Sequence, residues 1–213
     1  MVKKGFTLAE VLITLSIVGV ISALTVPNLV GNASKKGQVA LLRKAYLDLS
    51  EAIETELMEK DRATIGSLFS TDEKIQDFLK RHFKVTKNCG ASTSGCLASE
   101  IVTMDGASIT LPQNLNCITN AAGIAICMQV STEKNVVMID VNGTKDPNIK
   151  GRDVFALTYT NKGDLVDAIK VNGSYTDPYV TVSNDTLLTE CKASTDIGGC
   201  FEHILNNNWT MEY

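Results

Sequence analysis

Residues 5–34, GFTLAEVLITLSIVGVISALTVPNLVGNAS, decide how this chain is organised. Glu10 is the one charged residue in this segment, and no charge occurs from Val11 to Ser34. As an α-helix, that charge-free stretch would be about 36 Å long, enough to cross a hydrocarbon core of about 30 Å. A lysine pair precedes it at 3–4 and another follows at 35–36. The segment therefore predicts one membrane-spanning helix at the N-terminus.

Two ordinary explanations of such a segment are a cleaved secretory signal peptide and a simple membrane anchor. A small-residue site at Ser22-Ala23 would suit a secretory peptidase, but the apolar helical pattern continues without a break beyond it. Glu10 also lies inside the start of the apolar run, where a carboxylate is costly and usually functional. Both features favour an anchor with a further role.

Residues 3–10, KKGFTLAE, resemble the N-terminal signature of type IV prepilins and of the pseudopilins of type II secretion. In that family a short basic leader ends in glycine, phenylalanine follows, and a glutamate comes four residues later. The resemblance implies that prepilin peptidase cleaves between Gly5 and Phe6 and methylates the new amine of Phe6. Residues 1–5 would then be a removed leader, and residues 6–60 the membrane-anchor and filament-spine helix.

Glu10 is the expected assembly residue, together with Phe6. The two lie four residues apart and therefore share a helix face. In an apolar bundle, pairing the amine with the carboxylate offsets much of the cost of burying either charge. The resemblance implies that Glu10 of an incoming subunit meets the Phe6 amine of a subunit already in the filament. We expect Glu10→Ala to be cleaved normally and to assemble poorly.

Beyond Lys36 the helical pattern becomes one-sided. Apolar residues recur at steps of three and four, with charged residues opposite, which is typical of an amphipathic helix. The apolar stripe consists of Val39, Leu42, Tyr46, Leu49, Ile53 and Leu57. Joined to the anchor, this segment gives one helix of about 50 residues, much longer than the usual helix of a globular protein.

Gly19 and Pro27 interrupt the apolar half of this helix. Proline has no N–H to donate to the carbonyl of Ala23, so we expect a kink at Pro27. The resemblance implies that the helix can melt locally between the glycine and the proline when it packs in a filament.

Residues 61–213 have the pattern of one globular α+β domain. A helix is expected over 71–83 and a short one from Cys200 to near Asn206. Hairpin signals occur at 101–111, with Asp105-Gly106 at the tip, at 124–130 with 135–141, and at 154–160 with 165–171. Antiparallel strands after one long helix predict a pilin-like roll, in which the sheet packs on the amphipathic half of that helix.

Six cysteines follow the anchor, on the side that export would place in an oxidising compartment. Of the several pairings open to them, we favour sequence neighbours, because each pair closes a short loop bounded by turn-forming residues. The favoured pairs are Cys89–Cys96, Cys117–Cys127 and Cys191–Cys200. Zinc is less favoured, since no Cys-x2-Cys unit occurs and His82 and His203 are expected on helix surfaces.

Oxygen-bearing side chains recur in residues 140–153, DVNGTKDPNIKGRD. Asp140, Asn142, Asp146 and Asp153 are weak candidates for a calcium site, because hard cations prefer such oxygens. The spacing is not that of an EF-hand. A strand end that enters Asn-Gly and Asp-Pro turns explains the same residues more simply. No other cofactor is expected.

The composition narrows the function. A formal net charge of −4 and only one modest basic cluster, residues 80–84, make nucleic-acid binding unlikely. Motifs of serine hydrolases, zinc proteases and phosphate-binding loops are missing from the sequence, so an enzyme is not expected. The leading hypothesis is a structural subunit of a type IV pilus or of a type II secretion pseudopilus-like filament.

Two alternatives remain. One is a minor or non-polymerising pilin-like module, anchored in the membrane, for adhesion or DNA uptake. The other is a secreted ligand-binding protein with a conventional signal peptide. For the leading hypothesis the expected partners are other pilin subunits, prepilin peptidase, the inner-membrane assembly platform and the lipid bilayer. The chain would span the inner membrane once with its C-terminal domain outside the cytoplasm, and later lie in an extracellular or periplasmic filament.

Overall fold

The computed structural model describes residues 5–60, 64–129, 135–160, 162–171, 174–175, 182–193 and 195–213. The chain divides into two compact units, one ending at Gly37 and the other spanning Gln38–Tyr213. The division falls inside the longest element, α1 (Leu8–Glu59), a single helix of 52 residues. This length agrees with the continuous helix expected from the sequence.

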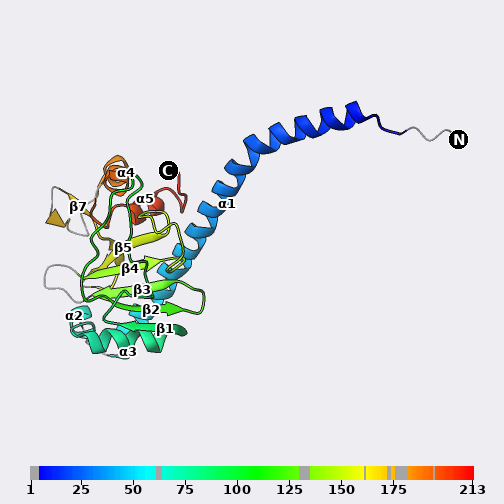
Figure 1. Ribbon diagram of the computed structural model, residues 1–213. Coiled ribbons are helices and arrows are strands. Elements are labelled where there is room, and N and C mark those ends of the chain that lie inside the picture. The colour runs from blue at the N-terminus through cyan, green and yellow to red at the C-terminus, as the bar shows by residue number, and fades with distance from the viewer. Residues whose placement is uncertain are drawn as a thin grey trace. The chain divides into compact units, whose positions relative to one another are not determined.

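In the first unit, α1 runs through Pro27 as one helix (Figure 1). Its polar side chains bond back to the helix itself: Ser16 Oγ donates to the carbonyl of Leu12 at 2.8 Å, and Thr25 Oγ1 to that of Ile21 at 2.9 Å. Such bonds satisfy hydroxyl groups in an apolar environment. The most apolar 18-residue window of α1 has a mean hydropathy of 2.1, and none of it is buried. By length and composition alone, α1 could cross a membrane. The kink at Pro27 stays a prediction.

The second unit is built on a six-stranded antiparallel sheet whose strands lie side by side in chain order. The strands are β1 (Val85–Gly90), β2 (Asn116–Asn120), β3 (Ala125–Gln129), β4 (Val136–Asp140), β5 (Val154–Tyr159) and β6 (Leu165–Asp167). A separate two-stranded ribbon joins β7 (Lys170–Val171) and β8 (Ser174–Tyr175). The smaller helices are α2 (Ile65–Leu68), α3 (Asp72–His82), α4 (Asn184–Ala193) and α5 (Cys200–Asn206). In Figure 1, α2 and α3 lie near β1, whereas α4 and α5 lie at the other end of the sheet.

Both faces of the sheet are buried, because side chains of alternate residues enter two different cores. In β3, Ile126 and Met128 join the core that contains Leu42, Leu49 and Ile53 of α1. The intervening residues of β3 join a second core, which includes side chains from the segment between β1 and β2. The members of that second core from this segment are Cys96, Leu97, Ile101, Ile109 and Leu115. The α+β class and the packing of the sheet on the amphipathic half of α1 are therefore as predicted.

Most of the predicted elements of this unit are confirmed. The helix over 71–83 is α3, and the helix ending near Asn206 is α5. The expected strand pairs are β3 with β4 and β5 with β6. Residues 130–134 and 161, which the predictions also covered, lie outside the described residues.

The hairpin expected at 101–111 is present as a tight antiparallel turn, but its arms are too short to form strands. Its tip closes as a turn, with the Thr103 N–H donating to the carbonyl of Ala107 at 2.8 Å, but Val102 makes only an isolated bridge to Ser108. Val102 also bridges to Ile149 in a parallel sense. The Ile109 N–H donates to the carbonyl of Ile101 at 2.9 Å, and both side chains are buried in the second core.

All three disulfides favoured from the sequence are present. They join Cys89 to Cys96, Cys117 to Cys127, and Cys191 to Cys200, across separations of 7, 10 and 9 residues. Cys117 and Cys127 face each other directly on β2 and β3. The third disulfide links α4 to α5.

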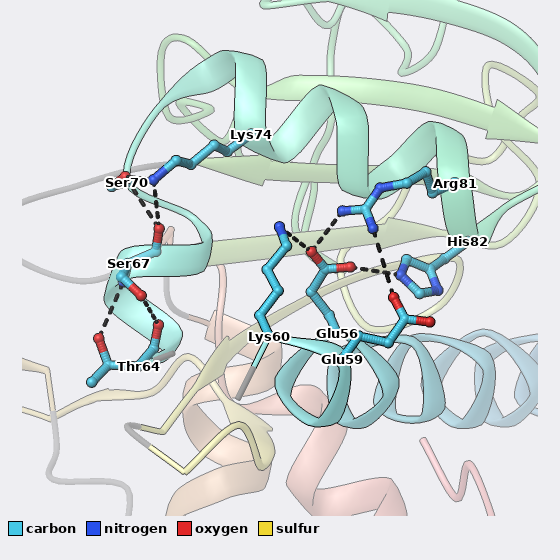
Figure 2. Close-up of polar contacts among 9 residues, drawn as sticks. All are labelled: Glu56, Glu59, Lys60, Thr64, Ser67, Ser70, Lys74, Arg81 and His82. Carbon is cyan, nitrogen blue, oxygen red and sulfur yellow. Dashed lines mark hydrogen bonds and ion pairs between the residues drawn. The ribbon is translucent and has the colours of Figure 1, made fainter. Parts of the chain in front are cut away.

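A buried glutamate joins α1 to α3 (Figure 2). The side chain of Glu56 is 2% exposed. Its Oε1 forms ion pairs with Arg81 Nη2 and with Lys60 Nζ, each at 2.6 Å. His82 Nε2 lies 2.9 Å from Glu56 Oε2. Burial alone would raise the pKa of Glu56, but the hydrogen bonds from Arg81, Lys60 and His82 outweigh it and hold the pKa at about 2. Glu56 is therefore ionised throughout the neutral range and fixes α3 on α1.

Candidate processing and assembly site

The residues of the expected cleavage site are fully accessible. Gly5, Phe6 and Thr7 precede the first turn of α1, and all three are exposed. The Phe6 side chain is 89% exposed. The rest of the expected leader, residues 1–4, lies outside the described residues. An accessible Gly-Phe bond outside the helix suits a protease, whose active site has to reach the backbone.

Glu10 begins the helix by bonding to Thr7. Glu10 Oε2 accepts from the Thr7 N–H at 2.8 Å and from Thr7 Oγ1 at 2.9 Å. In return, Thr7 Oγ1 accepts from the Glu10 N–H at 3.2 Å. This reciprocal arrangement is a capping box, in which Thr at the N-cap and Glu three residues later satisfy each other's backbone donors. The Thr-x-x-Glu spacing at 7–10 is the sequence signal for a capping box, and the predicted pairing of Glu10 with the Phe6 amine did not include this role.

The capping box and the expected amine pair compete for the same carboxylate. In the uncleaved chain the nitrogen of Phe6 is an amide, so the pairing of Glu10 with a free Phe6 amine stays a prediction. After cleavage, that amine would be a charged donor one residue before Thr7. Charged donors form stronger hydrogen bonds to carboxylates than neutral ones do. Glu10 therefore has two distinguishable roles, in capping and in charge pairing.

The part of α1 in the first unit presents an exposed apolar surface. Large side chains of the first unit, from Leu8 to Val30, are between 42% and 78% exposed. The amphipathic stripe after Lys36 differs sharply, since Leu42, Leu49 and Ile53 are completely buried. An apolar surface this large is not stable in water and marks contact with a membrane or with other protein.

Residues 140–153 comprise the last residue of β4 and the loop to β5, and hydrogen bonds connect all four calcium candidates predicted from the sequence. Asp153 Oδ1 accepts from the Ile149 N–H at 2.7 Å, and Asp153 Oδ2 from the Asn148 N–H at 2.9 Å. Asn142 Nδ2 donates both to Asp153 Oδ2, at 3.0 Å, and to the carbonyl of Asp146, at 3.1 Å. The backbone N–H of Asn142 donates to Asp140 Oδ1 at 3.1 Å. The turns expected here are present, with positive φ at Gly143, Asn148 and Gly151.

Two carboxylates of this loop are buried. Burial, together with the negative charge of Asp153, raises the pKa of Asp140 to about 8, although the backbone hydrogen bonds from Asn142 and Gly143 lower it. Burial also raises the pKa of Asp153, although the Ile149 and Asn148 amides lower it. No group of three or more His, Cys, Asp or Glu side chains is placed to hold a metal ion within the described residues.

One expectation about the histidines is wrong. His203 is only 5% exposed, although we expected it on a helix surface. It lies on the face of α5 that packs into the domain, with its ring 5.7 Å from that of Tyr213 and its Nε2 3.0 Å from Asn207 Nδ2. The C-terminal residues cover this face, and the short amphipathic pattern of α5 did not reveal them.

Comparison with known proteins supports the processing site predicted at the N-terminus. Residues 1–26 match the family model described as the prokaryotic N-terminal methylation motif. No curated protein and no solved structure matches the chain. The motif implies processing by prepilin peptidase and assembly with other pilin subunits, and with the long apolar helix it fits an inner-membrane-anchored pilin. The N-terminus of this chain therefore carries the signature of type IV prepilins and pseudopilins.

Proposed function

We propose that the chain is a structural, non-enzymatic subunit of a type IV pilus or type II secretion pseudopilus-like filament. The observation that carries the proposal is the methylation motif at residues 1–26, within which an apolar helix begins whose large side chains from Leu8 to Val30 are exposed. Before assembly, the bilayer would cover the exposed apolar side chains. In the filament, the same helix of neighbouring subunits would cover them.

The globular unit supports this role by its independence from the anchor. It has its own two hydrophobic cores and three internal disulfides, all within Gln38–Tyr213. A domain of this kind can remain folded when the anchor leaves lipid and enters a polymer. Disulfides also suit an oxidising, extracytoplasmic compartment. The assembly platform in the inner membrane would supply the force for that transfer.

The first test is the N-terminus of the mature protein, determined by mass spectrometry from the native host. We expect the chain to begin at Phe6 with a methylated amine. A chain that begins beyond Ala23 would indicate a conventional signal peptide and overturn the proposal. Filaments sheared from cells should contain the mature chain, and its absence from them would favour the minor or non-polymerising module.

The second test separates the two roles of Glu10. Glu10→Gln keeps an oxygen that can accept from the Thr7 N–H, because glutamine also completes a capping box, but it removes the charge. Thr7→Ala removes the side-chain half of the capping box and leaves the carboxylate. We expect Glu10→Gln to be cleaved but strongly impaired in filament yield, and Thr7→Ala to assemble.

Wild-type filament yield from Glu10→Gln would show that charge pairing with the Phe6 amine is not needed. Loss of assembly in Thr7→Ala alone would assign the role of Glu10 to capping. In both variants, the mass of the mature N-terminus controls for cleavage, since a leader that stays attached would prevent assembly by a different route.

A further inference from the structure

The globular unit carries opposite charges in two separate segments. Residues 78–99 contain four cationic side chains and no carboxylate, whereas residues 182–213 contain five carboxylates and one lysine. We call these segments the basic end and the acidic end. The cations are Lys80, Arg81, Lys84 and Lys87, and the carboxylates are Asp185, Glu190, Asp196, Glu202 and Glu212.

The two ends lie at opposite edges of the large sheet (Figure 1). β1 forms one edge of that sheet and β6 the other. The basic end includes β1 and the last turn of α3, and α3 packs on β1 to β3. The acidic end includes α4 and α5, and α5 packs on β5 and β6. Because neighbouring strands are about 4.8 Å apart, the two edges of six strands are separated by about 24 Å. The charges of the two ends therefore cannot pair within one chain.

The lysines of the basic end have no anionic partner. Lys80, Lys84 and Lys87 are exposed, and no carboxylate of the described residues lies within 4.0 Å of their nitrogens. Arg81 differs, since Glu56 of its own chain binds it. Lysine on an edge strand also prevents edge-to-edge pairing of sheets, a role that any charged side chain can fill. Charge reversal therefore distinguishes edge protection from the attraction of an anionic surface.

The acidic end is equally unneutralised. Asp185 and Glu212 are exposed and Glu202 is half-buried, and in the described part of the chain no cationic nitrogen lies within 4.0 Å of them. The buried Asp167 and Lys150 contact this end and add one charge of each sign. Exposed charges act over about 8–10 Å in physiological salt, so this surface favours a cationic partner.

The direction of α1 determines how the two ends would meet in a polymer. Tyr46 of α1 contacts Phe201 of α5, with ring centroids 5.1 Å apart, whereas Glu56 of α1 bonds to Arg81 of α3. Between Tyr46 and Glu56 a helix rises about 15 Å, so α1 passes the acidic end first and the basic end second. A screw operation along a filament keeps this direction the same in every copy. The basic end of one copy would then face the acidic end of the next, a head-to-tail contact that does not close into a ring.

We propose that the basic end of one copy of this chain docks on the acidic end of the next copy in the filament. This inference rests on the proposed function, because it requires copies in which α1 runs in one direction. The partner is a second copy, since the chain itself carries the complementary charge on the end that the same filament turns toward the basic end. The charges would fix the orientation of neighbouring globular units.

The first variant reverses the basic end. Lys80→Glu/Lys84→Glu/Lys87→Glu changes the side-chain charge of that end from +4 to −2. Expressed without the wild-type gene in the native host, it should give less than one tenth of the wild-type amount of mature chain in sheared filaments. Lys145→Glu/Lys162→Glu is the control, because it reverses two exposed lysines outside both ends and should assemble normally. A wild-type yield from the first variant would overturn the proposal, since glutamate protects a strand edge as lysine does.

The second variant reverses the acidic end. Asp185→Lys/Glu202→Lys/Glu212→Lys changes its side-chain charge from −4 to +2. Replacing Glu202 removes a charge that repels the buried Asp167, so the domain should stay folded. This variant alone should also give less than one tenth of the wild-type filament yield, and a normal yield would overturn the proposal. Thermal melts of both full-length variants in detergent verify that they are folded.

Co-expression of the two variants is the decisive experiment. In a mixed filament the two reversed ends attract each other, and so do the two unchanged ends, although neither variant is complementary to itself. We expect co-expression to restore at least half of the wild-type filament yield. No recovery from two folded variants would overturn the proposal and point to a partner other than this chain. If the wild-type chain itself is absent from sheared filaments, the proposed function fails, and this inference fails with it.

Discussion

Arg81 of α3 donates a hydrogen bond of 2.6 Å to Glu56 of α1, and the two residues are 25 positions apart in the chain. The glutamate is buried, whereas the arginine side chain is 44% exposed. Removing one member of a buried ion pair leaves the other without compensation, but solvent reduces that penalty when one partner is accessible. This contact therefore fixes α3 to α1 with intermediate strength.

We expect Glu56→Gln to lower the free energy of unfolding by about 1–3 kcal/mol, because Arg81, Lys60 and His82 lose a shared anion. Chemical denaturation of the full-length chain in detergent would measure the change. Glu54→Gln is the control, since Glu54 is exposed on the same helix. An equal loss in both variants would show that the charge of the helix, not the buried contact, is responsible.

The same glutamate predicts a pH dependence. The folded pKa of Glu56 is about 2, below its ordinary value of 4.5, so its contribution to stability is complete above pH 4.5 and declines as the pH falls toward 2. The difference in unfolding free energy between the wild-type chain and Glu56→Gln should therefore be constant from pH 5.5 to 7 and shrink below pH 4.5. A difference that grew on acidification would contradict the assignment.

Gly151 is expected to tolerate no side chain. A Cβ there would lie 2.5 Å from Cys200 Sγ and 2.8 Å from Cys191 Sγ, and the residue has a φ of +78°. We expect Gly151→Ala to destabilise the domain by about 2–4 kcal/mol, through left-handed backbone strain and overpacking. Gly106 also has a positive φ but nothing within 4 Å, so Gly106→Ala should cost only about 1–2 kcal/mol. Thermal melts of the two variants measure the difference, and equal melting temperatures would exclude the steric explanation.

Asp167 at the end of β6 holds the start of α5 in place. Its Oδ1 accepts from the Gly199 N–H at 2.7 Å and its Oδ2 from the Glu202 N–H at 2.8 Å. We expect Asp167→Ala to destabilise the domain by about 2–4 kcal/mol, because the buried Gly199 N–H and the half-buried Glu202 N–H both lose their acceptor. Hydrogen exchange should show faster exchange at Gly199 and Glu202 in the variant. Unchanged protection of both amides would contradict this role.

The sequence was sufficient for every feature that depends on local pattern. The steps of three and four from Val39 to Leu57 predicted the face of α1 that the sheet covers, and the short cysteine spacings predicted the three disulfides. The strand pairs around residues 135 and 164 followed from polar turns between apolar runs. In the disulfides and strand pairs the interacting residues lie close together in the chain, and the buried face of α1 follows from the spacing within one helix.

The contacts and buried residues that were not predicted from the sequence have a different origin. Ile101 and Ile109 alternate like strand residues, but they are buried because their segment covers the second face of the sheet. His203 is buried by residues that follow its own helix, and Glu56 meets Arg81 only when α3 folds back along α1. Such contacts depend on tertiary packing, which periodicity does not describe. Thr7 is the exception, since the capping-box spacing was visible in the sequence.

The order of the strands in the sheet has a consequence for how this domain folds. Every strand of the large sheet pairs with the next one in the chain. Each disulfide joins two cysteines that are at most 10 positions apart. Such local contacts require little loop closure, which favours rapid folding. A chain that emerges N-terminus first can therefore add one strand at a time to a helix that is already made. The contacts of Trp209 with Arg43 and Tyr46 close much longer loops, so the packing on α1 is complete only after the residues that follow α5 have joined it.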